Sequence, residues 1–172
     1  MPMTPIAVTI AGTTPLLCGR PATDADIQDA ADPRSQAAAR LYTDAAGEPV
    51  IPGLNLYRCI TGAARHVGRC PVELVHSLGV AERDVRIRSE HPWAIDSRMV
   101  RHPESGARCL CHRPRFDDWH LDLTLLVDRD AITGADVRTL LETAGVRVGL
   151  GDFRPERNGP FGRFVITAWD IL

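Results

Sequence analysis

The sequence contains no lysine: all 20 of its Lys and Arg positions are arginine. A guanidinium group is planar and donates two parallel hydrogen bonds to a phosphate, so every arginine here is suited to phosphate and to the face of a base. GC-rich coding produces the same bias. The absence of lysine is therefore compatible with a nucleic-acid partner without requiring one.

Long apolar runs are also missing, and none approaches the roughly 18 residues that a membrane span needs. The start, MPMTPIAVTIAG, has no basic region of a signal peptide, and the five cysteines are odd in number and scattered. We expect one domain over residues 1–172, located in the cytoplasm, with reduced thiols and no membrane partner.

The formal net charge of −2 hides an uneven distribution of charge along the chain. Residues 22–48 carry six acids and two arginines, or 2 − 6 = −4, whereas residues 83–115 carry eight arginines and four acids, or 8 − 4 = +4. Such asymmetry is compatible with a polyanionic partner.

Apolar spacing predicts the secondary structure, because alternation indicates strands and three- and four-residue spacing indicates helices. In the first half of the chain the predicted elements are a strand at 6–10, a helix at 53–67 ended by Gly68, and a short helix at 71–78. A strand at Val85 and Ile87, a hairpin at 92–112 and a strand within 119–128 follow. The last two are a helix capped by Thr133 and ended by a left-handed Gly145, and a strand at 163–172. This β-α-β-β-α-β order predicts an α+β, ferredoxin-like (RRM-like) fold with an antiparallel sheet. Residues 19–50 and 92–112 are then two insertions.

The stretch GLGDFRPERNGPFGRF, residues 149–164, lies between the predicted second helix and last strand. No helix follows GLG and no Gly-Lys-Ser/Thr is present, so it is neither a dinucleotide fingerprint nor a P-loop. Its glycines allow close approach of another backbone, its arginines are forked donors, and Phe153, Phe161 and Phe164 offer flat faces to a base. A purely structural turn is the alternative.

Two segments resemble the RAMP superfamily, the repeat-associated proteins of CRISPR systems. GEPVIPGLNLYRCITGAAR, at 47–65, is similar to the superfamily's entry to its first helix, although Asn55, Leu56 and Tyr57 depart from the usual residues. VGLGDFRPERNGPFGRF, at 148–164, is similar to its glycine-rich loop. The same pattern also looks like that of small proteins encoded by phages and prophages.

The resemblance implies binding of single-stranded, guide-like RNA, as a backbone subunit that assembles with copies of itself or with related RAMP subunits. It assigns RNA contacts to the first helix, to the glycine-rich loop and to a thumb-like hairpin. Those residues are Arg58 and Arg65; Gly149, Gly151, Arg154, Arg157, Gly159, Gly162 and Arg163; and Arg98, Arg101, Arg108 and Arg113. Two alternatives stay open: a phage assembly protein that uses the fold for protein–protein contacts, and a metal-dependent ribonuclease.

A catalytic role is not favoured by the sequence. The repeat-cutting RAMP enzymes use a histidine near the start of the first helix, where this chain has none, and His66 lies at the far end. The target-cutting type uses an aspartate after the first strand, for which Asp24, Asp26, Asp29 and Asp32 are the candidates. Cys109, Cys111 and His112 have poor spacing for zinc, because alternation puts the histidine on the opposite face of a strand. We predict no metal and no cofactor.

Overall fold

A four-stranded antiparallel sheet forms the centre of the computed structural model, which describes residues 3–21, 32–101 and 105–172. Its strands, in the order β10-β1-β9-β5, are β10 (Phe164–Ile171), β1 (Thr4–Gly12), β9 (His120–Val127) and β5 (Leu78–Val80). In chain order these are the fourth, first, third and second strands of the sheet, so β1 lies between β10 and β9, as the ferredoxin-like plan requires. The predicted fold class is confirmed.

Alternating side chains build the core from the two central strands. Ile6, Val8 and Ile10 of β1 are buried, and so are Leu121, Leu123 and Leu125 of β9. Their neighbours on the opposite face are more polar, as expected of a sheet with one covered face.

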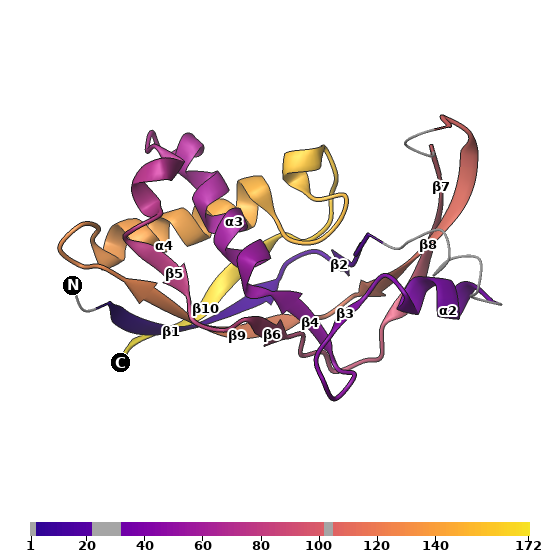
Figure 1. Cartoon of the computed structure of the whole chain (residues 1–172), viewed down its shortest axis with the longest axis horizontal. Coiled ribbons are helices and arrows are strands. Elements are labelled where there is room, and N and C mark those ends of the chain that lie inside the picture. Colours follow the sequence, from indigo (N-terminus) through magenta and orange to yellow (C-terminus); the bar gives the residue numbers. More distant parts are fainter. Residues whose placement is uncertain (1–2, 22–31, 102–104) are drawn as a thin grey trace.

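Two helices, α3 (Gly53–Ala63) and α4 (Gly134–Thr143), cover the same face of this sheet (Figure 1). Leu56 and Ile60 of α3 and Leu140 of α4 are at most 1% exposed, so the predicted apolar stripes face the core. A 3₁₀ turn at Ala64–His66 extends α3, and Gly68 follows with a φ of +71°. Thr133 caps α4 as predicted, accepting a hydrogen bond from the Asp136 amide.

The prediction of the second strand was wrong. Residues 84–86 do form a strand, β6 (Asp84–Arg86), but it pairs with β4 (Pro49–Pro52) in a separate sheet, β3-β4-β6, that also holds β3 (Tyr42–Thr43). The sheet position belongs to β5, which begins at Leu78, the last residue of the segment predicted as a short helix. Within that segment a 3₁₀ turn occupies only Pro71–Leu74. A three-residue strand with a central glycine is too short to show alternation.

The predicted end of the second helix was also wrong. Gly145 lies within a π-helical turn, Ala144–Val148, and the residue with a positive φ, of +75°, is Gly149. Gly145 is required for a different reason: a Cβ there would overlap the backbone carbonyl of Phe164 in the adjacent strand β10.

A long hairpin extends the molecule at the end away from the two termini (Figure 1). It consists of β7 (Ala94–Arg101) and β8 (Arg108–Phe116), with β2 (Leu16–Leu17) paired to the base of β8. The hairpin predicted at 92–112 is therefore present and continues to Phe116, while residues 102–104 of its turn lie outside the described residues.

The segment 19–50 contains a helix that apolar spacing did not predict, α2 (Pro33–Ala38). The Asp32 side chain caps it, accepting hydrogen bonds from the amides of Arg34 at 2.9 Å and Ser35 at 3.1 Å. The Ser35 hydroxyl also donates to this carboxylate, and this bond is the largest cause of its lowered pKa. Asp24, Asp26 and Asp29 lie outside the described residues.

Across the described ranges, no helix is both long enough and apolar enough to cross a membrane.

Candidate nucleic-acid interface

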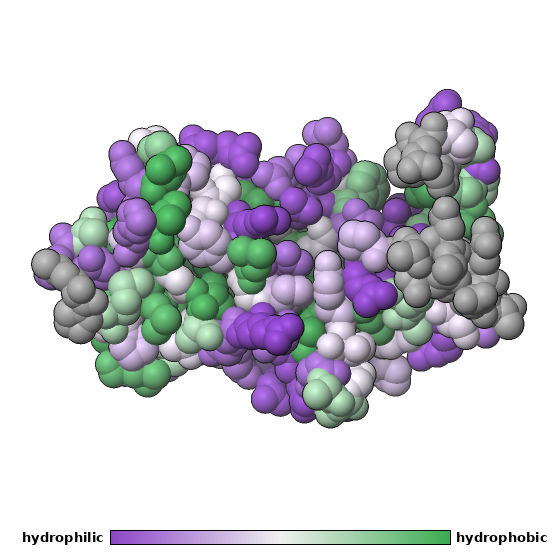
Figure 2. All heavy atoms as spheres, in the orientation of Figure 1, coloured by the Kyte–Doolittle hydropathy of each residue, from purple (hydrophilic) through white to green (hydrophobic). Residues whose placement is uncertain are grey.

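The glycine-rich loop lies beside the N-terminal half of α3, and the two enclose an open cleft of about 450 Å³. Its lining residues are Cys18, Gly19, Tyr42, Val50, Ile51, Asn55, Arg58, Cys59, residues 148–152, Arg154, Glu156 and Arg157. Hydrophilic side chains gather over the glycine-rich loop in the surface view (Figure 2). Two segments 90 residues apart in sequence, both expected to contact RNA, thus line one cleft.

Five of the predicted contact residues meet in this cleft: Arg58, Gly149, Gly151, Arg154 and Arg157. Arg58 and Arg157 are exposed. Neither side chain has a hydrogen-bond or ion-pair partner among the described residues. These two guanidinium groups can therefore form bidentate hydrogen bonds to a phosphate without first breaking an internal bond.

Glu156 holds the other two arginines of this region. Its carboxylate accepts from Arg65 and from Arg154, each at 2.8 Å, and Arg154 also donates to the Gly151 carbonyl at 3.1 Å. Arg65 does not line the cleft; it lies at its edge, with 58% of its side chain exposed. A phosphate would have to compete with Glu156 for both cations.

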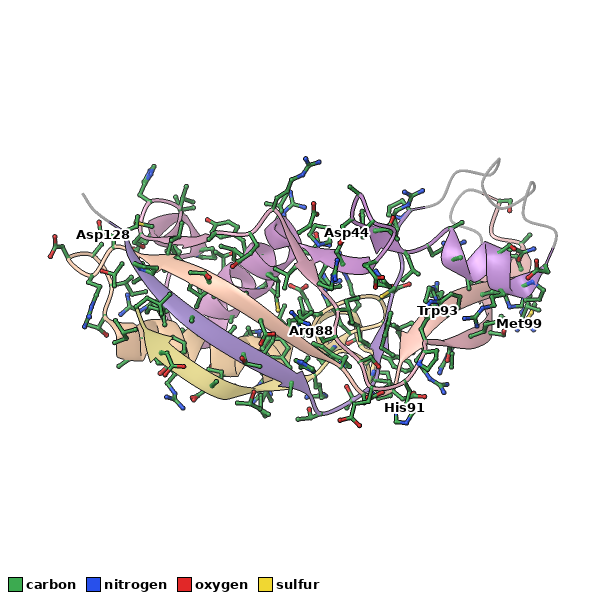
Figure 3. The ribbon with its side chains drawn as sticks, turned by 90° about the horizontal axis from the view of Figure 1, so that it is seen from below. Asp44, Arg88, His91, Trp93, Met99 and Asp128 are labelled. Atoms are coloured by element: carbon green, nitrogen blue, oxygen red, sulfur yellow. The ribbon has the colours of Figure 1, made fainter. Side chains whose placement is uncertain are left out.

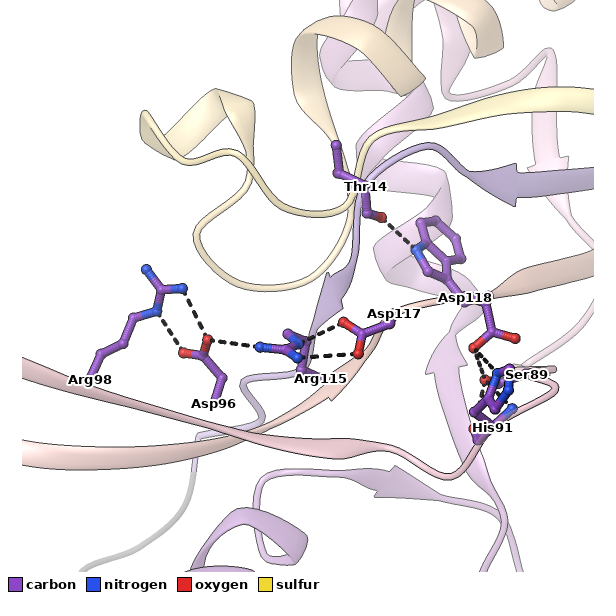
Figure 4. Close-up of polar contacts among 9 residues, drawn as sticks. Thr14, Ser89, His91, Asp96, Arg98, Arg115, Asp117 and Asp118 are labelled. Atoms are coloured by element: carbon purple, nitrogen blue, oxygen red, sulfur yellow. Dashed lines mark hydrogen bonds and ion pairs between the residues drawn. The ribbon is translucent and has the colours of Figure 1, made fainter.

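Two arginines of the hairpin connect it to the glycine-rich loop. Arg113 Nε lies 2.8 Å from a carboxylate oxygen of Asp152, without the alignment of a hydrogen bond. Arg98 forms a bidentate pair with the buried carboxylate of Asp96, at 2.6 and 3.0 Å, and its guanidinium stacks 4.9 Å from the ring centre of Phe161. Figure 4 shows Arg98 reaching from the hairpin toward the loop. Both side chains are thus engaged within the protein.

The remaining predicted contacts lie outside the cleft. Arg163 donates to the Val146 carbonyl at 2.6 Å and so caps the turn after α4. Arg101 and Arg108 are exposed and face each other near the tip of the hairpin. Gly159 and Gly162 are buried within the loop.

Packing explains why this loop needs so many glycines. Gly151 and Gly162 have φ values of +74° and +70°, and a Cβ on either would overlap a backbone carbonyl, of Leu17 and Leu150 respectively. Most of the amides are used internally; between residues 149 and 154, those of Gly151 and Arg154 alone donate to no described acceptor. This part of the loop is therefore a packed structure with two available amides and not an open row of donors.

The two thiols of the cleft are not nucleophiles at neutral pH. Burial raises the pKa of Cys18 to about 12, with the Asp152 charge adding to the shift. Burial likewise raises the pKa of Cys59 to about 12, and this thiol donates to the Gly149 carbonyl at 3.2 Å. Both sulfurs stay protonated and act as parts of the cleft wall.

The uncovered face of the central sheet has the wrong chemistry for a polyanion. Figure 3 views the molecule from this side, with Arg88 near the middle of the sheet. A shallow groove of about 290 Å³ on this face is lined by Glu82, Asp122 and Asp170, together with uncharged residues of β1, β9 and β10. Arg88 pairs with Asp122 at 3.1 Å, so its charge is already neutralised. These carboxylates favour the loop side as the phosphate-binding face.

Among the cleft residues that sequence reasoning missed are Tyr42, Asn55, Asp152 and Glu156. The acids of the loop carried a usable signal, because they alternate with arginines in DFRPER and so indicate internal ion pairs. Tyr42 carried none, since it enters the cleft through the pairing of β3 with β4.

Among the described residues one group of three has metal-binding geometry, Glu90, His91 and Asp118. Figure 4 shows Asp118 beside His91 and Ser89. Asp118 accepts from the Ser89 hydroxyl at 3.0 Å and from the Glu90 amide at 2.8 Å, which stabilises this turn. Cys109 and Cys111 lie on one face of β8, and His112, on the other, bonds to Ser97 at 2.7 Å.

Solved structures with the same architecture were found by comparison. A chain of the type III-B Cmr-beta complex bound to cognate target RNA superposes with a TM-score of 0.71 at 12% identity, over 99% of this chain and 61% of that one. The chain has the same fold as this Cmr-beta chain. Cmr6 from Pyrococcus furiosus also shares it, with a TM-score of 0.52 at 12% identity, over 96% of this chain and 99% of that one.

The present chain therefore spans about three fifths of the Cmr-beta chain, and nearly all of Cmr6. No model of a known protein family matches the sequence. No curated protein matches it either. At this level of identity the likeness shows the fold, and function has to be argued from the cleft.

Proposed function

We propose that this chain binds single-stranded RNA through the cleft between α3 and the glycine-rich loop, as a subunit of a CRISPR-type ribonucleoprotein or of a phage-borne relative. The observation that carries the proposal is the pair Arg58 and Arg157. They are exposed, they have no partner within the described chain, and they face one cleft. The fold is shared with part of one chain of a complex solved with its cognate target RNA bound.

The two arginines hold the phosphate backbone. Each guanidinium donates two parallel hydrogen bonds to phosphate oxygens, and the Gly151 and Arg154 amides add donors on the loop side. None of these groups reads a base edge, so binding has weak sequence preference. Phosphate contacts also release counterions, so affinity falls as salt rises.

Glu156 limits the affinity of the isolated subunit. While it pairs with Arg65 and Arg154, it reduces the positive charge of the cleft by one unit and occupies two donors. This favours modest affinity for a single copy and tighter binding when several copies engage one strand, because each further contact is then intramolecular. Partners in such an assembly are copies of this chain or related RAMP subunits.

A pure assembly role, without nucleic acid, is the second candidate. The observation that favours it is that two carboxylates of the loop pair with cations in and around it: Asp152 with Arg113, and Glu156 with Arg65 and Arg154. Asp32, the described member of the aspartates considered for RNA cleavage, caps α2 and gives no support to a ribonuclease.

Titration of a labelled single-stranded RNA of mixed sequence, at 50 to 300 mM salt, separates the two candidates. We expect binding whose logarithm falls linearly with the logarithm of the salt concentration, and weaker binding of the matching duplex. The ratio of absorbance at 260 and 280 nm of the freshly purified protein is a simpler first reading. Absence of binding at the lowest salt would leave the assembly role.

A further inference from the structure

The glycine-rich loop holds one phenylalanine in a backbone conformation that this residue rarely adopts. Phe153 has a φ of +47°, a genuine outlier for a bulky side chain. The same loop could have used glycine or asparagine here, and both take this conformation with little cost. Such strain persists where surrounding contacts fix it, and it gathers at functional sites.

The loop is shaped around this residue. Gly159 packs directly against it, because a Cβ on Gly159 would overlap the Phe153 carbonyl and approach its ring to 2.7 Å. The Phe161 amide donates to the Phe153 carbonyl at 3.3 Å, and the Phe161 ring lies 6.2 Å away at a tilt of 43°. Arg98 of the hairpin in turn stacks on Phe161. The Phe153 ring is therefore supported by Gly159 and Phe161, and Arg98 supports Phe161 in turn.

The other side of the ring is open. Phe153 is 39% exposed, whereas Phe161 and Phe164 are 7% and 1% exposed. Of the three phenylalanines in the loop, Phe153 alone can meet a ligand. A fixed, half-exposed ring is a poor use of apolar surface unless something covers it.

The residues on either side of Phe153 indicate which ligand could reach its ring. Asp152 and Arg154, on either side of Phe153 in sequence, both line the cleft, whereas Phe153 itself lies at the rim. Adjacent Cα atoms are about 3.8 Å apart, so Phe153 lies within a few ångströms of residues that line the cleft. An RNA strand with a phosphate in the cleft would therefore carry one of its bases past Phe153.

We propose that Phe153 is a stacking surface for one unpaired nucleobase of the bound strand, an inference that rests on the function proposed above. Stacking requires a flat face and no particular hydrogen-bond pattern, so it is compatible with weak sequence preference. It also selects single strands, because a base within a duplex is not free to leave its neighbours. Fixing the ring in advance reduces the entropy lost on binding.

The test compares two variants and two ligands. Phe153→Leu keeps an apolar side chain and the same strained φ but removes the ring, and Phe153→Tyr keeps the ring. The ligands are a single-stranded RNA and an abasic ribose-phosphate chain of the same length and charge. Thermal unfolding of both variants checks that the fold is retained.

We expect Phe153→Leu to bind the RNA roughly 5- to 100-fold more weakly than the wild type, from the usual contribution of one stacked base. Phe153→Tyr should bind as the wild type does. The wild type should bind the abasic chain more weakly than the RNA, and Phe153→Leu should lose nothing further on that ligand.

Equal binding of RNA by Phe153→Leu and the wild type would overturn the stacking role while leaving the phosphate contacts intact. The stacking role would also be overturned if Phe153→Leu lost the same affinity for the RNA and for the abasic chain, because that loss would not depend on a base. Failure of the wild type to bind either ligand would instead remove the proposed function itself.

Discussion

Replacing Arg58 and Arg157 by alanine should weaken the binding of single-stranded RNA and make it less sensitive to salt. Both side chains are exposed and have no described partner, so their removal breaks no internal ion pair. For a single strand, each phosphate contact contributes about −0.7 to the slope of log affinity against log salt. Loss of two contacts should therefore reduce the slope by about 1.4.

The expected loss of affinity follows from the exposure of the two groups. Solvent screening limits each contact to about 1 kcal/mol, so the pair contributes about 2 kcal/mol, or roughly 30-fold in Kd. Fluorescence anisotropy with a labelled RNA, at five salt concentrations, measures both quantities. The matched control is Arg129→Ala with Arg138→Ala, which removes the same charge outside the cleft: Arg129 follows β9, and Arg138 pairs with Glu142 on α4.

A slope that stays the same in the double variant would refute the assignment of these two residues. An equal change in the control would show that the effect comes from net charge and not from the cleft.

Three further changes test other parts of the structure. Glu156→Gln should tighten RNA binding roughly three- to tenfold, because it frees two arginines at the cleft; unchanged affinity in the same titration would contradict this. Gly162→Ala should lower the free energy of unfolding by about 2–3 kcal/mol, because the added Cβ overlaps a carbonyl. The control Gly106→Ala should cost about 1 kcal/mol, because φ is also positive there but the space is open. Equal shifts in the thermal unfolding of the two variants would count against the packing described here. Hydrogen bonds from Ser35 lower the pKa of Asp32 in the folded protein. The Asp32 carboxylate therefore stabilises α2 above the unfolded-state pKa, near 4, and this stabilisation is lost as pH falls through the folded-state pKa. Hydrogen exchange of the α2 amides between pH 5 and 2.5 should show this loss in the wild type and not in Asp32→Asn.

The sheet and its two covering helices could be predicted because their patterns are local. The buried residues of β1 and β9 alternate, and α3 and α4 carry continuous apolar stripes. The position of the second strand could not be predicted, since β5 spans three residues and depends on its pairing with β9. The Asp-Pro pair at 32–33 was a usable signal for α2, because aspartate caps a helix and proline suits its first position.

The candidate site was predictable in its two segments and not in its charges. Arg58 and Arg157 could be placed by the resemblance of those segments to the RAMP superfamily. That Arg65 and Arg154 share one carboxylate depends on how the loop folds back over α3. Phe153 differs from Phe161 and Phe164 in exposure and in φ, neither of which can be read from a run of loop residues.

Photo-crosslinking tests the central claim most directly. A single-stranded RNA with 4-thiouridine at every uridine is bound to the full chain, irradiated, digested, and the modified peptides are identified by mass spectrometry. We predict crosslinks to residues 42–58 and 149–157, the two sides of the cleft. Crosslinks confined to the uncovered sheet face, around Asp122 and Asp170, would contradict the account.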